Sequence, residues 1–231
     1  IGRIARAKGI PFHVDAAQAA GKFAINVQDL GIDLLSFSAH KMYGPKGIAA
    51  LYLRKKHPRV RLEPLLHGGG QEAGLRSGTL NVPAIVGFGK ACEIAQEEMG
   101  SERERIGKLR DRLESSLRQQ LGDLWLNGDP VKRLYNNLNL TFPGVDAESL
   151  LTELSTQVAV STGSACVSRS LEPSYVLKAL GARDEKIHAS VRFGLGRFNT
   201  KEEIERVSVL VTESVKRLRA VSPWKMQKSS S

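Results

Sequence analysis

The sequence predicts a mixed α/β fold arranged as two successive domains, and three observations carry this prediction. Short apolar runs of strand length occupy residues 11–15, 33–38 and 48–53. A stretch with helical periodicity then extends from residue 82 to residue 121. Beyond it, short runs with strand character alternate with helical segments as far as residue 219. Strands and helices that alternate in this way are typical of α/β architecture.

The beginning of the chain has the pattern of a helix end. Ile1 and Ile4 have helical spacing, basic residues fill the last turn, and Gly9 is a stop signal. We infer from this pattern that the chain begins inside an α/β unit and that an upstream portion is missing. The alternative is a short, frayed N-terminal helix.

The three apolar runs of the first half are predicted strands of one sheet, with a short amphipathic helix after the first of them. Because these runs are nearly all apolar, we expect both faces of the sheet to be covered. In the second half, we predict strands at 136–142, 158–161 and 189–195 and helices near 146–154, 172–180 and 200–219.

Composition restricts the class of protein. The 231 residues carry a formal net charge of +10, which favours an anionic cofactor, an acidic protein surface or nucleic acid as a partner. No apolar run approaches the ~18 residues of a membrane-spanning helix, and the first residues lack a secretory signal pattern. We therefore expect a soluble, intracellular protein. The two cysteines, Cys92 and Cys166, form neither a disulfide framework nor a metal-ligand cluster.

Two charged residues follow predicted strands in the first half. Asp15 ends the first strand, and Lys41 comes shortly after the second, just before a break at Gly44. Taken singly, Asp15 is equally well explained as a helix cap and Lys41 as an exposed loop lysine. Open α/β sheets, however, gather ligand-binding groups at such strand ends. Together the two residues supply what a pyridoxal phosphate site requires: a Schiff-base lysine and a carboxylate that keeps the pyridine nitrogen protonated.

Five segments extend this pattern along the chain. They are, in order, "HVDAAQAAGK", "SFSAHKMYGPKG", "GGGQEAGLRSGT", "STGSACVSRSLEPSYVLKALG" and "SVRFGLGRFNTKEEI". Together they resemble the Isc-type cysteine desulfurases, which are pyridoxal phosphate enzymes of fold type I and are similar to class V aminotransferases. The resemblance implies the C-terminal part of a large, mainly parallel-sheet cofactor domain over residues 1–98. It implies a smaller α/β domain with a cysteine-bearing loop over residues 99–231.

The resemblance also implies a role for each cofactor-binding residue. Asp15 would pair with the protonated pyridine nitrogen, and Gln18 would hydrogen-bond the phenolate oxygen of the cofactor. Ser38 and His40 would hold phosphate oxygens. Lys41 would form the Schiff base with the cofactor and take part in proton transfer.

Three further positions complete the implied site. Thr79 would reach the phosphate of the cofactor in the other subunit, which implies a homodimer. Arg192 would bind the α-carboxylate of the substrate through a bidentate pair. Cys166 lies among small and polar residues, as accessible reactive thiols do, whereas Cys92 has apolar neighbours on a predicted helix. We expect Cys166 to be the reactive thiol and Cys92 to belong to the core.

The activity implied by the resemblance is conversion of L-cysteine to L-alanine, with a persulfide formed on Cys166. The sulfur would pass to an iron-sulfur scaffold or another acceptor protein and supply iron-sulfur clusters and other thio-cofactors. No metal, nucleic acid or membrane partner is expected. The location would be cytoplasmic in a bacterium and the mitochondrial matrix in a eukaryote. We expect the chain Ile1–Ser231 by itself to be inactive.

Two other readings of the sequence remain open. Another fold-type I enzyme, such as a selenocysteine lyase or an aminotransferase, would share Asp15, Lys41 and Arg192 but would not need Cys166. A noncatalytic fragment could instead bind an acidic protein or nucleic acid through the basic run at residues 54–61. That run lacks the interleaved aromatic residues of single-strand binders, and solvated surface charge explains it more simply.

Overall fold

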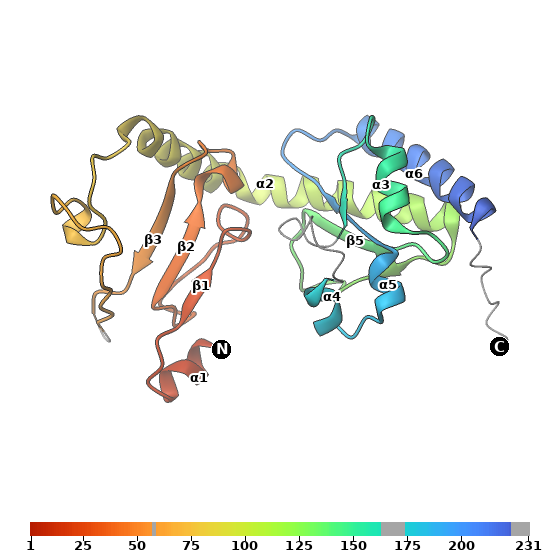
Figure 1. The fold of residues 1–231 in the computed structure, drawn as a ribbon. Coiled ribbons are helices and arrows are strands. Elements are labelled where there is room, and N and C mark those ends of the chain that lie inside the picture. The colour runs from red at the N-terminus through yellow and green to blue at the C-terminus, as the bar shows by residue number, and fades with distance from the viewer. Residues whose placement is uncertain (57–58, 163–173, 223–231) are drawn as a thin grey trace. The chain divides into compact units, whose positions relative to one another are not determined.

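The computed structural model describes residues 1–56, 59–162 and 174–222 (Figure 1). The chain folds into two compact units, Ile1–Gly100 and Ser101–Ser231. The first contains α1 (Gly2–Ala7), β1 (His13–Asp15), β2 (Leu34–Ser38), the 3-10 turn η1 (Ala39–Met42), β3 (Ala49–Leu53), the 3-10 turn η2 (Glu72–Gly74) and the first half of α2 (Val82–Leu121). The second contains the rest of α2, β4 (Trp125–Leu126), β5 (Asn137–Thr141), α3 (Ala147–Leu154), β6 (Ser161–Thr162), α4 (Tyr175–Ala179), α5 (Asp184–His188), β7 (Ser190–Gly194) and α6 (Lys201–Val221).

The first unit is built on a three-stranded sheet in the order β1-β2-β3. The pair β1–β2 is parallel and the pair β2–β3 is antiparallel, so the mainly parallel character predicted for this domain is not seen among these strands. Leu35 on β2 belongs to a buried cluster with Ala16 and Ile32. Phe37, on the same face, meets Phe88 of α2 with ring centroids 5.5 Å apart. One face of the sheet therefore carries the core.

The opposite face differs from the sequence-based expectation of a covered surface. Strand alternation and the parallel register place Asp15, Ser36 and Ser38 on this second face, together with Leu51 of β3. Asp15 is exposed, and 51% of the surface of Leu51 is accessible. Asp15, Ser36 and Ser38 thus share one face instead of being scattered through a fully covered sheet.

Consecutive turns replace the amphipathic helix predicted after Asp15. The amides of Ala19 and Ala20 donate to the carbonyl of Ala16 at 2.9 and 2.8 Å, as in the first turn of a helix. Gly21 then adopts a φ of +72°, a left-handed conformation that stops helical progression. The chain therefore turns back toward β2 after a single turn.

Helix α2 carries a different buried stripe in each unit. In the first unit the buried positions are Ala84, Phe88, Ala91 and Ala95. In the second unit they are Glu102, Ile106, Leu109, Leu113, Leu117 and Leu121. Spacings of three and four residues place each set on one side of the helix, as the sequence periodicity predicted. The remaining positions carry most of the charge of this segment.

The second unit contains an antiparallel sheet in the order β4-β5-β7-β6. Helices α3 and α6 pack against each other, and buried Leu150, Val211 and Val215 contribute to the core. The predicted strand at 158–161 is shifted, because β6 consists of Ser161 and Thr162. None of the described helices is long and apolar enough to cross a membrane.

Candidate functional site

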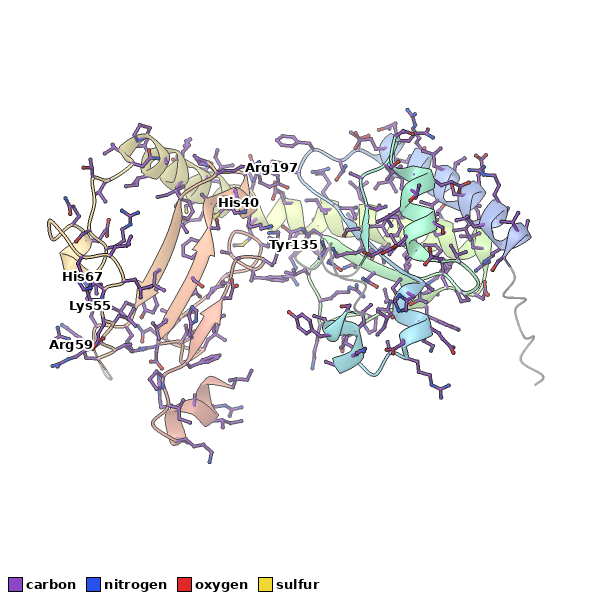
Figure 2. All side chains as sticks on the ribbon, in the orientation of Figure 1. His40, Lys55, Arg59, His67, Tyr135 and Arg197 are labelled. Atoms are coloured by element: carbon purple, nitrogen blue, oxygen red, sulfur yellow. The ribbon has the colours of Figure 1, made fainter. Side chains whose placement is uncertain are left out.

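The residues predicted to bind a ligand lie at one end of the sheet in the first unit. Strands β1 and β2 are parallel, with Asp15 in register with Ser36, so their carboxyl ends reach the same edge. The chain then continues from Ser38 directly into η1, which contains His40 and Lys41. Figure 2 shows His40 at this end of the strands, while Lys55, which follows β3, is at the opposite end. The strand geometry thus brings Asp15 to the same edge of the sheet as η1 (Ala39–Met42), which we call the lysine turn.

Asp15 holds the backbone that leaves β1. Its Oδ1 accepts a hydrogen bond from the amide of Ala17 at 2.9 Å, and the side chain is exposed. The capping role considered from the sequence is therefore partly correct, although the carboxylate caps a turn instead of a helix. A carboxylate oxygen offers more than one acceptor site, so this local bond leaves Asp15 able to accept from a ligand.

Lys41 lies in a 3-10 turn instead of a loop. Ala39 and Met42 are buried in this turn, whereas His40 and Lys41 are exposed. The buried pair anchors the turn to the core cluster that contains Phe88. Because two positions of the turn face the core, the two positions between them are directed away from it.

A hydrogen bond joins two of the predicted phosphate ligands. Ser38 Oγ and His40 Nδ1 are 2.8 Å apart. The pair combines a hydroxyl and an imidazole within three residues, and both groups can donate to an anion. Only Ala39, which is buried, separates the two residues in the chain, and Lys41 follows His40 directly.

Glycines allow the chain to pack closely around the lysine turn. A Cβ on Gly44 would lie 3.0 Å from the Cβ of Ala39 and 3.1 Å from that of Ala91. A Cβ on Gly87 would lie 2.7 Å from Cγ of Pro45. These glycines let α2 approach the segment "YGPKG", so the backbone after Lys41 has a fixed course.

The remaining predicted ligands belong to other segments of the chain. Gln18 is exposed in the turn that follows β1, and Thr79 is exposed in the loop before α2. Arg192 belongs to the second unit, where it is half-buried on β7 between Asn139 and Ser161. Cys166 falls outside the described residues.

Arg192 lies on the strand that pairs with the last described residues before Cys166. Its strand neighbour Ser161 lies on β6, and Thr162 pairs with Val191. Cys166 is four positions beyond Thr162 in the sequence and lies outside the described residues. The sheet therefore places Ser161 and Thr162, the last described residues before Cys166, beside the strand of the predicted carboxylate-binding arginine.

The structure adds three polar residues that were not assigned to the site from the sequence. Ser36 Oγ lies 3.1 Å from Nε2 of His13, and both residues are on the face of the sheet that carries Asp15. Lys22 Nζ donates to the carbonyl oxygen of Lys41 at 3.2 Å. The period-two spacing of Ser36 and Ser38 in "SFS" was the available signal for the first of these. No local pattern indicated Lys22, because its partner is 19 residues away.

Cys92 has the environment expected of a structural cysteine. It is partly buried and packs against the core cluster of Ala39, Met42, Phe88 and Ala95. Burial raises the pKa of the Cys92 thiol above its ordinary value. A raised pKa disfavours the thiolate, which is the reactive form, so the structure agrees with the core role predicted for this residue.

Polar groups of a different kind occupy the opposite end of the same sheet. Arg54 Nε and Asp33 Oδ1 form an ion pair at 2.9 Å, with side chains 5% and 9% exposed. The guanidinium also donates to Gln28 Oε1 at 2.6 Å and to the carbonyl of Ile32 at 2.7 Å. Arg54 begins the basic run at 54–61 and is buried, so it is not available to the acidic partner considered from the sequence.

The second unit contains a hollow of about 1030 Å³ near the end of α6. Its lining includes Trp125, Val145, His188 and Val221 but none of the predicted site residues. Lys186 Nζ lies 4.1 Å from the ring centroid of Trp125 at its wall. Among the described residues, no group of three or more histidine, cysteine, aspartate or glutamate side chains is arranged to hold a metal ion.

The residues at the sheet edge fit part of pyridoxal phosphate. The cofactor presents an aldehyde, a pyridine nitrogen and a phosphate, and the edge provides an amine, a carboxylate and a hydroxyl–imidazole pair. Asp15, His40 and Lys41 are exposed and therefore accessible to a ligand. The donor set is thus chemically matched to this group.

The family described as "Aminotransferase class-V" matches residues 1–207 of the chain. A protein named "Cysteine desulfurase IscS" from Shewanella baltica (strain OS223) is 54% identical over 229 residues, which cover 99% of this chain and 56% of that protein. A protein of the same name from Methylobacillus flagellatus is 55% identical over 227 residues, 98% of this chain and 55% of that protein. The chain therefore spans just over half the length of these relatives.

Solved structures show the same similarity. A "NifS-like protein" matches with a TM-score of 0.82 and 38% identity, over 93% of this chain and 55% of that one. A NifS-like protein from Rickettsia africae matches with a TM-score of 0.81 and 32% identity, over 95% of this chain and 56% of that one. These matches confirm the resemblance inferred from the five sequence segments.

Proposed function

Because the chain belongs to the class-V aminotransferase family, we propose that the complete protein is a pyridoxal phosphate-dependent cysteine desulfurase. Its substrate would be L-cysteine and its products L-alanine and a persulfide on Cys166. The single observation that carries this proposal is the position of Asp15 and the Lys41 turn at one edge of the sheet. The names of the Shewanella and Methylobacillus relatives support the choice of reaction.

The cofactor, when bound, supplies an electron sink that weakens bonds at the substrate Cα. Asp15 would maintain the positive charge on the pyridine nitrogen, which makes the ring a better sink. Ser38 and His40 would hold the phosphate. Lys41 would hold the cofactor aldehyde and move a proton at the substrate Cα.

The remaining groups would act on the substrate. Arg192 would orient its carboxylate, and the Cys166 thiolate would accept its sulfur. In the balanced reaction, the substrate C–S bond breaks and an S–S bond forms. The electron pair of the C–S bond stays with carbon. Of the two thiol hydrogens, one from the substrate and one from Cys166, one ends on the new methyl group of alanine and the other on the persulfide. A sulfur-acceptor protein, such as an iron-sulfur scaffold, would then receive the terminal sulfur.

Subunit pairing and location are part of the same proposal. Thr79 is exposed in its loop, so it is accessible to a cofactor held by a second subunit. We therefore propose a homodimer that acts in the bacterial cytoplasm, as the bacterial origin of the relatives suggests.

Mass spectrometry of the complete protein tests the reaction. After incubation with pyridoxal phosphate and L-cysteine, the peptide that contains Cys166 should gain one sulfur atom, and alanine should form. Cys166→Ser should abolish the persulfide, while Cys92→Ser, the matched control, should retain it. Persulfide on the Cys166→Ser protein would contradict the assignment of this residue. Turnover of L-selenocysteine with none of L-cysteine would instead identify a selenocysteine lyase.

A further inference from the structure

Lys22 contacts the backbone of the residue on which the proposed chemistry depends. Its Nζ donates to the carbonyl oxygen of Lys41 at 3.2 Å, and its side chain is half-buried. The two lysines are 19 residues apart and belong to different turns of the first unit. The contact therefore links the turn after β1 to the turn after β2.

The preceding glycine allows this approach. Gly21 has a φ of +72°, and a Cβ at that position would lie 3.0 Å from Cε of Met42 and 3.2 Å from its Cβ. It would also lie 3.3 Å from the Cβ of Ala95. Any other residue would crowd Met42 in addition to straining the backbone. Gly21 thus lets the backbone pass close to Met42, and Lys22, the next residue, reaches the carbonyl of Lys41 with its long side chain.

The carbonyl that Lys22 contacts is at the end of a short helical turn. The last carbonyls of a helix have no partner within that helix, and a lysine can satisfy them from outside. The turn η1 is followed by Tyr43, which has a φ of +66° and is not a glycine. Left-handed residues other than glycine persist where the surroundings fix the backbone. The bond from Lys22 to the carbonyl of Lys41 lies two residues before this left-handed residue.

We propose that Lys22 is a positioning residue for Lys41. It fixes the carbonyl of Lys41 and so restricts the directions available to the side chain of the same residue. This role rests on the proposed function, in which Lys41 holds the cofactor aldehyde. A guanidinium in place of the ammonium could still donate to the carbonyl, whereas an apolar side chain of similar length could not.

Hydrogen exchange and cofactor binding, measured on the complete protein, test this role. Lys22→Met removes the donor, Lys22→Arg keeps one, and Lys46→Met removes an exposed lysine charge from the loop after the turn. In cofactor-free protein, amide exchange in the peptide spanning residues 39–44 should rise about three- to tenfold for Lys22→Met, the range of one net hydrogen bond. The dissociation constant for pyridoxal phosphate, from absorbance titration, should rise by a similar factor. Lys22→Arg should restore both values, and Lys46→Met should change neither.

The outcomes separate positioning from general stability. Faster exchange confined to the turn, with rescue by arginine, supports the role. Equal acceleration throughout the first unit would show that Lys22 only stabilises the fold, and identical behaviour of Lys22→Met and Lys46→Met would show that the bond has no effect. Failure of the wild-type protein to bind pyridoxal phosphate would overturn the proposed function. The exchange measurement would still decide whether Lys22 holds the turn.

Discussion

The two ends of the sheet in the first unit use polar residues in opposite ways. At one end, Asp33 and Arg54 are buried, and their contacts join segments more than 20 residues apart. At the other end, Asp15 and His40 are exposed and hydrogen-bond residues two positions away. Buried charges must be paired within the fold, whereas exposed groups with only local bonds can still bind a ligand. The first end is therefore structural and the second is suited to binding.

The largest effect is expected from Lys41→Ala in the complete protein. Loss of the amine should lower turnover of L-cysteine by about a thousandfold or more, as removal of a covalent catalytic group does in other enzymes. Because Lys41 is exposed, the free energy of unfolding should change little. Alanine formation and denaturant titration measure the two quantities, with Lys46→Ala as the control. A large loss of stability would show that Lys41 supports the fold, as Asp33 and Arg54 do, and that the two ends of the sheet do not differ in this way.

Arg54→Met should have the opposite outcome. It leaves Asp33 buried without its cation, which destabilises the fold by about 3–5 kcal/mol. Denaturant titration should show this loss, and Lys55→Met, at the adjacent exposed residue, should lie within about 0.5 kcal/mol of wild type.

A double variant refines this result. Asp33→Leu combined with Arg54→Met removes both charges and should recover much of the loss, because an apolar pair can replace a buried ion pair. If Arg54→Met were as stable as wild type, the pair would not be the structural element that its burial indicates.

The two aspartates allow a direct comparison of the two ends. Asp15→Asn should reduce turnover about ten- to a hundredfold, the range of one charge-assisted hydrogen bond, with little change in stability. Asp33→Asn should instead lower stability, because it removes the charge that faces Arg54. Steady-state kinetics and thermal unfolding of both variants measure the difference. Equal effects of the two substitutions on both quantities would remove the distinction between the ends.

The smallest effect is expected from an exposed group whose role is structural. Hydrogen bonds, first from the side chain of Asn199 and then from the amide of Thr200, lower the pKa of the Glu203 carboxyl at the start of α6. Since this pKa is lower in the folded state, the contribution to stability is present above the ordinary carboxyl pKa. It is lost as the pH falls through the lowered value.

Unfolding measured between about pH 6 and pH 3 should therefore show a smaller acid-dependent loss for Glu203→Gln than for wild type. Glu213→Gln, at an exposed position of the same helix, is the control. This experiment measures how much an exposed local hydrogen bond contributes to the free energy of unfolding. The same scale then applies to the local bonds of Asp15 and His40. An unchanged acid profile in Glu203→Gln would show that the capping interaction does not affect folding.

Elements with clear periodicity were predicted well from the sequence. The strand at 33–38 and the helix at 82–121 correspond to β2 and α2, because a buried stripe leaves a regular spacing of apolar residues. β4 and α5, with two and five residues, were missed because elements this short contain no measurable period. The helix predicted after Asp15 failed for a related reason, since the conformation of Gly21 ends it after one turn.

By itself, the sequence determined the chemistry that the chain can offer: a lysine and an aspartate after two apolar strands, and segments that resemble a known family. Those features are local, so residue order preserves them. Only the tertiary structure decided the register of the parallel pair β1–β2, in which Asp15 is aligned with Ser36 and so lies at the edge that holds Lys41. It also decided that Arg54 is buried against Asp33 and that Lys22 contacts Lys41. These contacts join residues about 20 positions apart, and folding creates such proximity without leaving a periodic signal in the intervening chain.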